Sequence, residues 1–112
     1  MASAAQLSVA EGRRSNRSRV NCQLIGEHRL RGEIVLHVAN ISTDGFMTAS
    51  ATGMSRGERI VVRLPQVGHI EAHLLWSLDE RAGFQFERII RSDDFELMIA
   101  AIRPAERLQP VS

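Results

Sequence analysis

Residues 60–76 decide the fold class, and they have the sequence IVVRLPQVGHIEAHLLW. Apolar side chains occupy every second position in two runs, Ile60–Leu64 and Ile70–Trp76. This period of two is typical of a β-strand with one face buried and the other exposed. Pro65 and Gly68 lie between the two runs and favour a turn. The stretch therefore predicts two short strands with a turn between them.

Four further segments are predicted to be short strands, and turn-forming residues separate them. The strands are Val20–Leu24, Ile34–Val38, Phe46–Ala49 and Phe84–Phe86, with turns at Arg29–Gly32 and Asp79–Gly83. Trp76, Phe84 and Phe86 are expected to share one buried face. Six short strands at close spacing favour an antiparallel barrel or sandwich over a parallel sheet.

The end of the chain has the pattern of a single amphipathic helix. Ser92 is a suitable N-cap, and the acidic residues 93–94 follow it in the first turn, where the helix dipole favours negative charge. Pro104 is expected to end the helix, which gives it bounds of about 92–103. We expect the apolar stripe of this helix to cover the open end of a barrel. The stripe consists of Phe95, Met98, Ile99 and Ile102.

The length of 112 residues fits one domain, with residues 1–12 expected to be a mobile segment and residues 13–112 the domain itself. No membrane span is predicted, because the longest apolar run, Leu97–Ile102, is far shorter than the roughly 20 residues required. The first ten residues lack the pattern of a secretory signal. Cys22 is the only cysteine and shares the parity of the core residues, so we expect a buried thiol and a cytoplasmic location.

No catalytic machinery is visible in the sequence. There is no paired set of acids and no Gly-x-Ser-x-Gly segment, so we predict that the protein is not an enzyme. His69 and His73 have the i, i+4 spacing of a helical zinc site, but they lie in a strand pattern. Four residues of a strand span about 13 Å, so the two imidazoles cannot share one ion. We expect surface histidines, with no metal and no cofactor.

Positive charge is concentrated near the start of the chain. All 14 basic residues are arginine, and residues 1–19 contain four of them against Glu11 alone, a net charge of +3. Residues 20–112 contain ten arginines and twelve acidic residues, a net charge of −2. The planar guanidinium group suits phosphate and the edge of guanine.

Two motifs flank the first pair of predicted strands. The first is Arg13-Arg14-Ser15-Asn16-Arg17, an Arg-x-x-x-Arg spacing, and the second is Asn40-Ile41-Ser42-Thr43-Asp44-Gly45, an Asn-x-Ser-x-x-Gly spacing. Together they resemble the PilZ domain, a bacterial receptor module for cyclic di-GMP. The run Ile70–Trp76 followed by Gly83–Phe86 also resembles a late strand and hairpin of that family. The resemblance covers residues 13 to about 102 and implies an all-β fold, a six-stranded antiparallel barrel with a C-terminal helix.

The resemblance implies a cyclic di-GMP site made by Arg13, Arg14, Arg17, Asn40, Ser42 and Gly45. Arginine forks suit the phosphates and the guanine O6 and N7 atoms, and Asn40 can accept from the guanine N1–H. We expect Ser42 to bond the ligand and Gly45 to adopt a positive φ or to approach the base closely. The family more often has aspartate where this chain has Asn40. Gly12 replaces an arginine that is frequent in members binding a ligand dimer, so we expect one ligand per chain.

The expected mechanism is a switch in which cyclic di-GMP orders residues 10–19 over the barrel and the domain signals to a separate effector protein. One alternative is a degenerate PilZ domain that acts as a protein–protein adaptor without nucleotide binding. A second alternative is binding of RNA or single-stranded DNA through the arginines. Such sites usually interleave aromatic side chains, and this chain has only five, so we expect no nucleic acid polymer as partner.

Overall fold

The computed structural model describes residues 17–50 and 52–107 and has the expected fold class. Six strands are followed by one helix: β1 (Ser18–His28), β2 (Gly32–Ile41), β3 (Gly45–Thr48), β4 (Arg59–Leu64), β5 (Gly68–Leu78), β6 (Arg81–Phe86) and α2 (Ser92–Arg107). The strands form a closed barrel in the order β1-β2-β3-β6-β5-β4, with every neighbouring pair antiparallel. The expected mobile segment 1–12, together with Arg13 and Arg14, lies outside the described residues.

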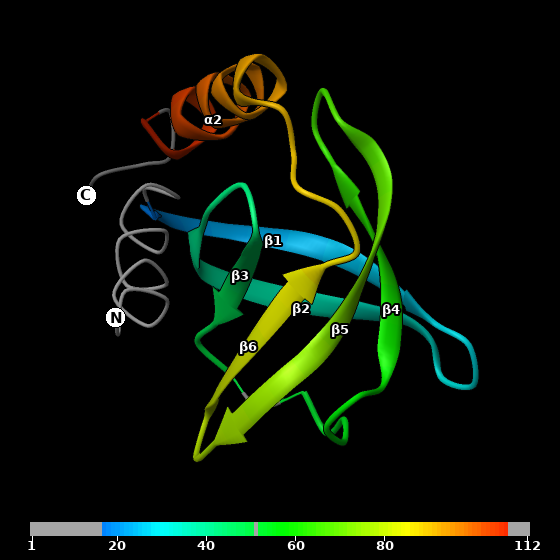
Figure 1. The fold of residues 1–112 in the computed structure, drawn as a ribbon. Coiled ribbons are helices and arrows are strands. Elements are labelled where there is room, and N and C mark those ends of the chain that lie inside the picture. The colour runs from blue at the N-terminus through cyan, green and yellow to red at the C-terminus, as the bar shows by residue number, and fades with distance from the viewer. Residues whose placement is uncertain (1–16, 51, 108–112) are drawn as a thin grey trace, which may run out of the picture.

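Alternate residues of the strands fill the barrel, as the period of two predicts. Phe46 is fully buried at the centre, where its ring stacks on that of Phe84 at a centroid distance of 4.8 Å. All four residues of the predicted helix stripe are buried, and Met98 is completely inaccessible to solvent. Helix α2 lies across one end of the barrel (Figure 1), so its apolar face completes the core there. Cys22 is half-buried and packs against this core.

Helix α2 extends beyond the predicted end point. The helix continues through Pro104 to Arg107, so the expected bound of about residue 103 was wrong. A proline φ near −65° is itself helical, and its main cost inside a helix is one lost backbone hydrogen bond together with crowding of the preceding turn. Within residues 17–50 and 52–107, no helix has the length and apolar character needed to cross a membrane.

A β-bulge in β5 overturns the expectation that Trp76 belongs to the core. Leu74 lies opposite Phe84 of β6, but Trp76 lies opposite Gly83, so β5 advances two residues while β6 advances one. The extra residue, Leu75, reverses the parity of the strand, and Trp76 moves to the outer face with 41% of its surface exposed. Gly83, expected in the turn, is therefore part of β6.

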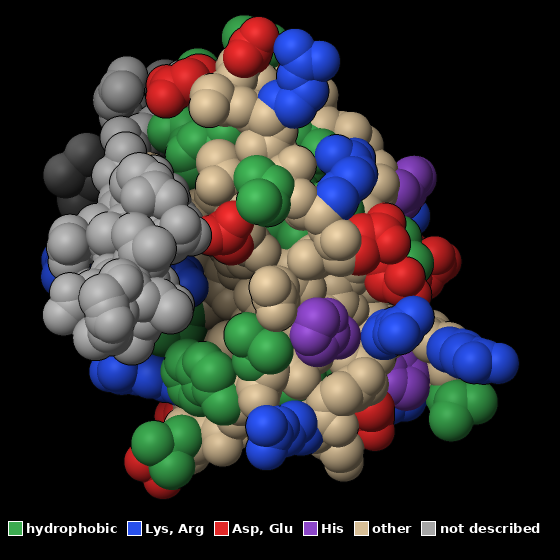
Figure 2. All heavy atoms as spheres, in the orientation of Figure 1, with side chains coloured by type: hydrophobic (Ala, Val, Ile, Leu, Met, Phe, Trp, Pro, Cys, Tyr) green, Lys and Arg blue, Asp and Glu red, His purple; other side chains and the backbone are tan. Residues whose placement is uncertain are grey.

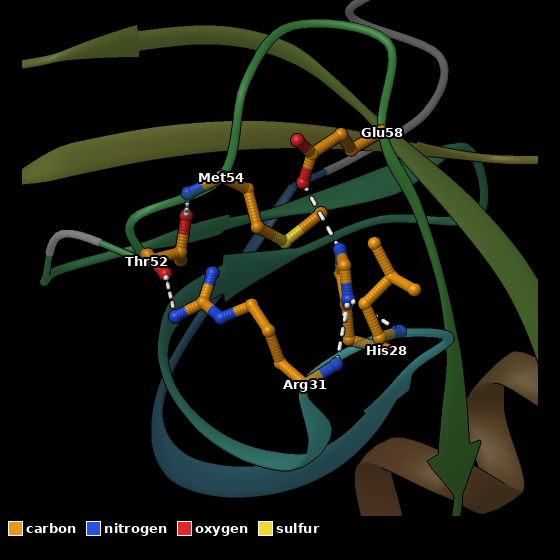
Figure 3. Close-up of polar contacts among 6 residues, drawn as sticks. His28, Arg31, Thr52, Met54 and Glu58 are labelled. Carbon is orange, nitrogen blue, oxygen red and sulfur yellow. Dashed lines mark hydrogen bonds and ion pairs between the residues drawn. The ribbon is translucent and has the colours of Figure 1, made fainter.

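A polar cluster joins the β1–β2 turn to the loop between β3 and β4 (Figure 3). The Nδ1 atom of His28 accepts hydrogen bonds from two backbone N–H groups of the turn, at 3.1 and 3.2 Å. The Nε2 atom therefore carries the ring hydrogen and donates it to Glu58 at 3.0 Å. Arg31 donates to the carbonyl oxygen of Thr52 at 3.1 Å. These bonds fix the loop, and the carbonyl oxygen of Glu58 then accepts from the N–H of Leu74, immediately before the bulge.

Candidate functional site

The register of the barrel aligns residues from five strands in one row on its outer face. Arg19 of β1 lies opposite Asn40 of β2, and Asn40 lies opposite Met47 of β3. Met47 in turn lies opposite Gly83 of β6, and Gly83 opposite Trp76 of β5. Residues that are far apart in the sequence thus become neighbours on the surface.

A hollow of about 220 Å³ opens along this row. Its walls and floor are formed by Arg17, Asn40, Phe46, Met47, Leu75, Trp76, Gly83 and Phe84. The phenylalanines belong to the buried core, so they form an apolar floor. The polar groups come from β2 and from the residue that precedes β1. The hollow therefore combines an apolar floor with a cation and an amide at its rim, as small-ligand sites commonly do.

Arg17 and Asn40, two of the predicted site residues, are hydrogen-bonded to each other at this rim. The Nη1 atom of Arg17 donates to Oδ1 of Asn40 at 2.6 Å. The Nδ2 atom of Asn40 approaches the sulfur of Met47 at 3.8 Å, a weak hydrogen bond. Both contacts assign the same orientation to the amide, with its oxygen toward the arginine. An acceptor and a permanent cation therefore lie side by side, ready to bond a ligand with both anionic and donor groups.

Trp76 forms a flat wall of the hollow because residue 83 has no side chain. A Cβ atom on Gly83 would lie 2.5 Å from Cε2 and 2.9 Å from Cζ2 of the indole, much closer than atoms can approach. The indole thus lies directly on the backbone of β6. Since the other side of the ring system is partly exposed, a planar group can stack there.

Ser42 makes the turn between β2 and β3, and its side chain does not line the hollow. The residue is only 1% exposed, and its hydroxyl oxygen accepts hydrogen bonds from the N–H groups of Asp44 and Gly45 at 3.1 and 3.3 Å. Such a local hydroxyl-to-backbone bond replaces the hydrogen bonds that the turn cannot make with a neighbouring strand. That Ser42 also bonds a ligand stays a prediction.

Gly45 is required for packing and not for a left-handed backbone. Its φ is not among the positive values of the described residues, so the expectation of a positive φ was wrong. A Cβ atom at this position would collide with the carbonyl oxygen of Phe84 in the adjacent strand β6. This close approach to β6 brings Phe46 and Met47 of β3 beside the hollow, and an approach of Gly45 to a ligand base stays a prediction.

The predicted site contained two of the eight residues that line the hollow and missed the other six: Phe46, Met47, Leu75, Trp76, Gly83 and Phe84. Trp76 and Gly83 belong to the segments that resemble the PilZ hairpin, so that resemblance was the available indication. Nothing in the sequence indicated that Met47 lines the hollow. The solvent-face placement of His69 and His73 is confirmed, because the alternating residues Ile70 and Leu74 point into the core.

Comparison with known proteins supports the fold and leaves the family open. No protein-family model matches the chain, and no curated protein matches it. The structure of the inhibitor of motility MotI/DgrA from Bacillus subtilis is similar, with a TM-score of 0.54 and 20% sequence identity over 84% of this chain. The match covers 51% of that protein, so the present chain spans about half its length. This likeness shows the fold alone, and it supports a PilZ-like barrel.

Proposed function

We propose that this protein is a cyclic di-GMP receptor domain that signals to a separate protein. The observation that supports the proposal is the meeting of Arg17, Asn40 and Trp76 around one hollow, from three separate parts of the sequence. Two of these residues belong to the motifs that resemble the PilZ domain. The proposal does not include catalysis.

The chemistry of these three groups matches the chemistry of a guanine nucleotide. The guanidinium of Arg17 can form two parallel hydrogen bonds with a phosphate or with O6 and N7 of guanine. The amide oxygen of Asn40 can accept from N1–H and the exocyclic amine. The exposed face of Trp76 offers a surface for base stacking. In the absence of ligand, Arg17 and Asn40 satisfy each other, so ligand binding exchanges their bond for bonds to the nucleotide.

Arg13 and Arg14 complete the proposed site from the segment that precedes Arg17. Arg17 lies at the rim of the hollow, and Arg13 and Arg14 precede it by only four and three residues in the sequence, which supports a role for them in binding phosphates there. Ordering a residue costs about 1–2 kcal/mol, whereas each hydrogen bond to a charged group contributes about 1.5–3 kcal/mol. These comparable terms give reversible binding, and the ligand-ordered segment would form the surface that the effector recognises.

Calorimetric titration with cyclic di-GMP tests the proposal. We expect one ligand per chain. Arg17→Ala should raise the dissociation constant about 10- to 150-fold, which corresponds to the loss of one charge-assisted hydrogen bond. Asn40→Ala should also raise the dissociation constant. The matched control is Arg63→Ala, because Arg63 is an exposed arginine of β4 that pairs only loosely with Glu33 at 3.7 Å. Its dissociation constant should equal that of the unmodified protein.

Absence of binding by the folded protein would reject the receptor function and favour the adaptor alternative. One observation supports a role as a protein–protein adaptor. Leu75, Trp76 and Leu78 are exposed apolar residues close together on one hairpin. Such clusters are typical of protein–protein contact sites.

A further inference from the structure

The tip of the β5–β6 hairpin has an open backbone edge. Strand β4 pairs with β5 no further than His73, and the β3–β4 loop adds hydrogen bonds only at Leu74. Beyond this point, among the described residues, segment 75–78 of β5 pairs only with β6. All four residues of the segment are exposed, and the hairpin projects from the barrel at the lower left of Figure 1.

Two of the features that usually protect an exposed strand, charged side chains and proline, are absent from this edge, and the bulge at Leu75 lies at its start. Residues 75–78 are Leu-Trp-Ser-Leu, without a charged residue or a proline. Leu78 is 67% exposed. A surface groove of about 780 Å³ runs beside the segment, lined by Ala49, Trp76, Leu78, Asp79, Glu80 and Arg81. Figure 2 shows hydrophobic side chains over this part of the molecule with acidic and basic side chains close by.

We propose that this edge binds the same edge of a second copy of the chain, in an antiparallel pair centred on Ser77. Antiparallel pairing of two identical edges is related by a two-fold axis, so the contact is self-complementary and closes as a dimer. With Ser77 at the axis, Leu78 of one copy lies opposite Trp76 of the other. These apolar pairs are then removed from water on both sides of the axis.

Charge complementarity supports a second copy as the occupant. The same register brings the acidic tip of each hairpin, Asp79 and Glu80, toward Leu74 of the other copy. The N–H of Gly57 is hydrogen-bonded to the carbonyl oxygen of Leu74 at 2.9 Å, so the exposed residue that precedes it in the sequence, Arg56, lies near the position that the incoming tip would take.

Sedimentation velocity over a range of protein concentrations tests the proposal without any ligand. We expect a monomer–dimer equilibrium in the unmodified protein, and Leu78→Glu should weaken it by at least about tenfold, since two leucines leave the contact. The matched control is Leu30→Glu at the tip of the β1–β2 hairpin, where the leucine is 87% exposed. This control should dimerise like the unmodified protein. Circular dichroism establishes that both variants remain folded.

A charge exchange tests the register. Arg56→Glu should weaken the dimer, because the new carboxylate repels the acidic tip. The double variant that also carries Glu80→Arg should associate again. A protein that remains monomeric at millimolar concentration would overturn the proposal. A dimer equally affected by Leu78→Glu and Leu30→Glu, or one that the charge exchange does not restore, would also overturn it. These measurements use no cyclic di-GMP, so they test the dimer whether or not the receptor function holds. Because the contact covers Trp76, this dimer and base stacking on that ring exclude each other.

Discussion

Replacing Gly83 by alanine should displace Trp76 and weaken ligand binding while the barrel stays folded. The new Cβ would lie 2.5 Å from Cε2 of the indole, whereas carbon atoms in contact are about 3.5 Å apart. The ring must therefore move outward by about 1 Å. Because the ring is already partly exposed, we expect a loss of stability of about 1 kcal/mol, at the low end for overpacking. Base stacking on an aromatic ring contributes roughly 1–3 kcal/mol, so its loss should raise the dissociation constant about 5- to 150-fold.

The assay is calorimetric titration with cyclic di-GMP, together with thermal unfolding of each variant. Trp76→Phe serves as the second background, because phenylalanine lacks the part of the indole nearest to Gly83. The loss caused by Gly83→Ala should be smaller in that background than in the unmodified protein. The reasoning is refuted if a folded Gly83→Ala variant binds with unchanged affinity, or if the loss is the same in both backgrounds.

Three substitutions test the structural assignments. Gly45→Ala should lower the free energy of unfolding by about 3 kcal/mol in urea denaturation, because the new Cβ meets the backbone carbonyl of Phe84, which cannot move aside. A smaller loss of stability than that caused by Gly83→Ala would contradict this. Ser42→Ala should cost about 1–3 kcal/mol of stability by removing the acceptor of the buried Gly45 N–H and the part-buried Asp44 N–H. Calorimetry should show an unchanged cyclic di-GMP affinity if the hydroxyl acts only in the turn. Met98→Ala should lower the free energy of unfolding by about 2–5 kcal/mol, whereas Leu97→Ala, at a 55% exposed position on the same helix, should change it by no more than about 0.5 kcal/mol. Equal losses of stability would show that α2 does not cover the core as described.

The strands and the helix could be predicted because alternate burial depends only on local parity. In β4, for example, the apolar side chains that recur every second residue from Ile60 to Leu64 point into the barrel. The stripe of α2 follows the helical period in the same way, and Met98 is its most buried member. Pro104 was misjudged because a favourable φ can let a helix continue past a proline.

The hollow could not be predicted in full because it depends on register between strands. One additional residue, Leu75, turns Trp76 from the core to the surface, and no local pattern marks the position of such a bulge. Met47 reaches the hollow only because β3 lies between β2 and β6. The structure gives the turn residues Ser42 and Gly45 hydrogen-bonding and packing roles within the turn and against β6, whereas their contact with a ligand stays a prediction.

The most direct test of the proposed receptor function is a nuclear magnetic resonance titration that follows the indole N–H of Trp76. The chain contains a single tryptophan, so this signal is unique and reports on the wall of the hollow alone. Cyclic di-GMP should shift it saturably, together with the backbone amides of Arg17 and Asn40, and GMP at the same concentration should have little effect. An indole signal that does not move at saturating cyclic di-GMP would contradict the account.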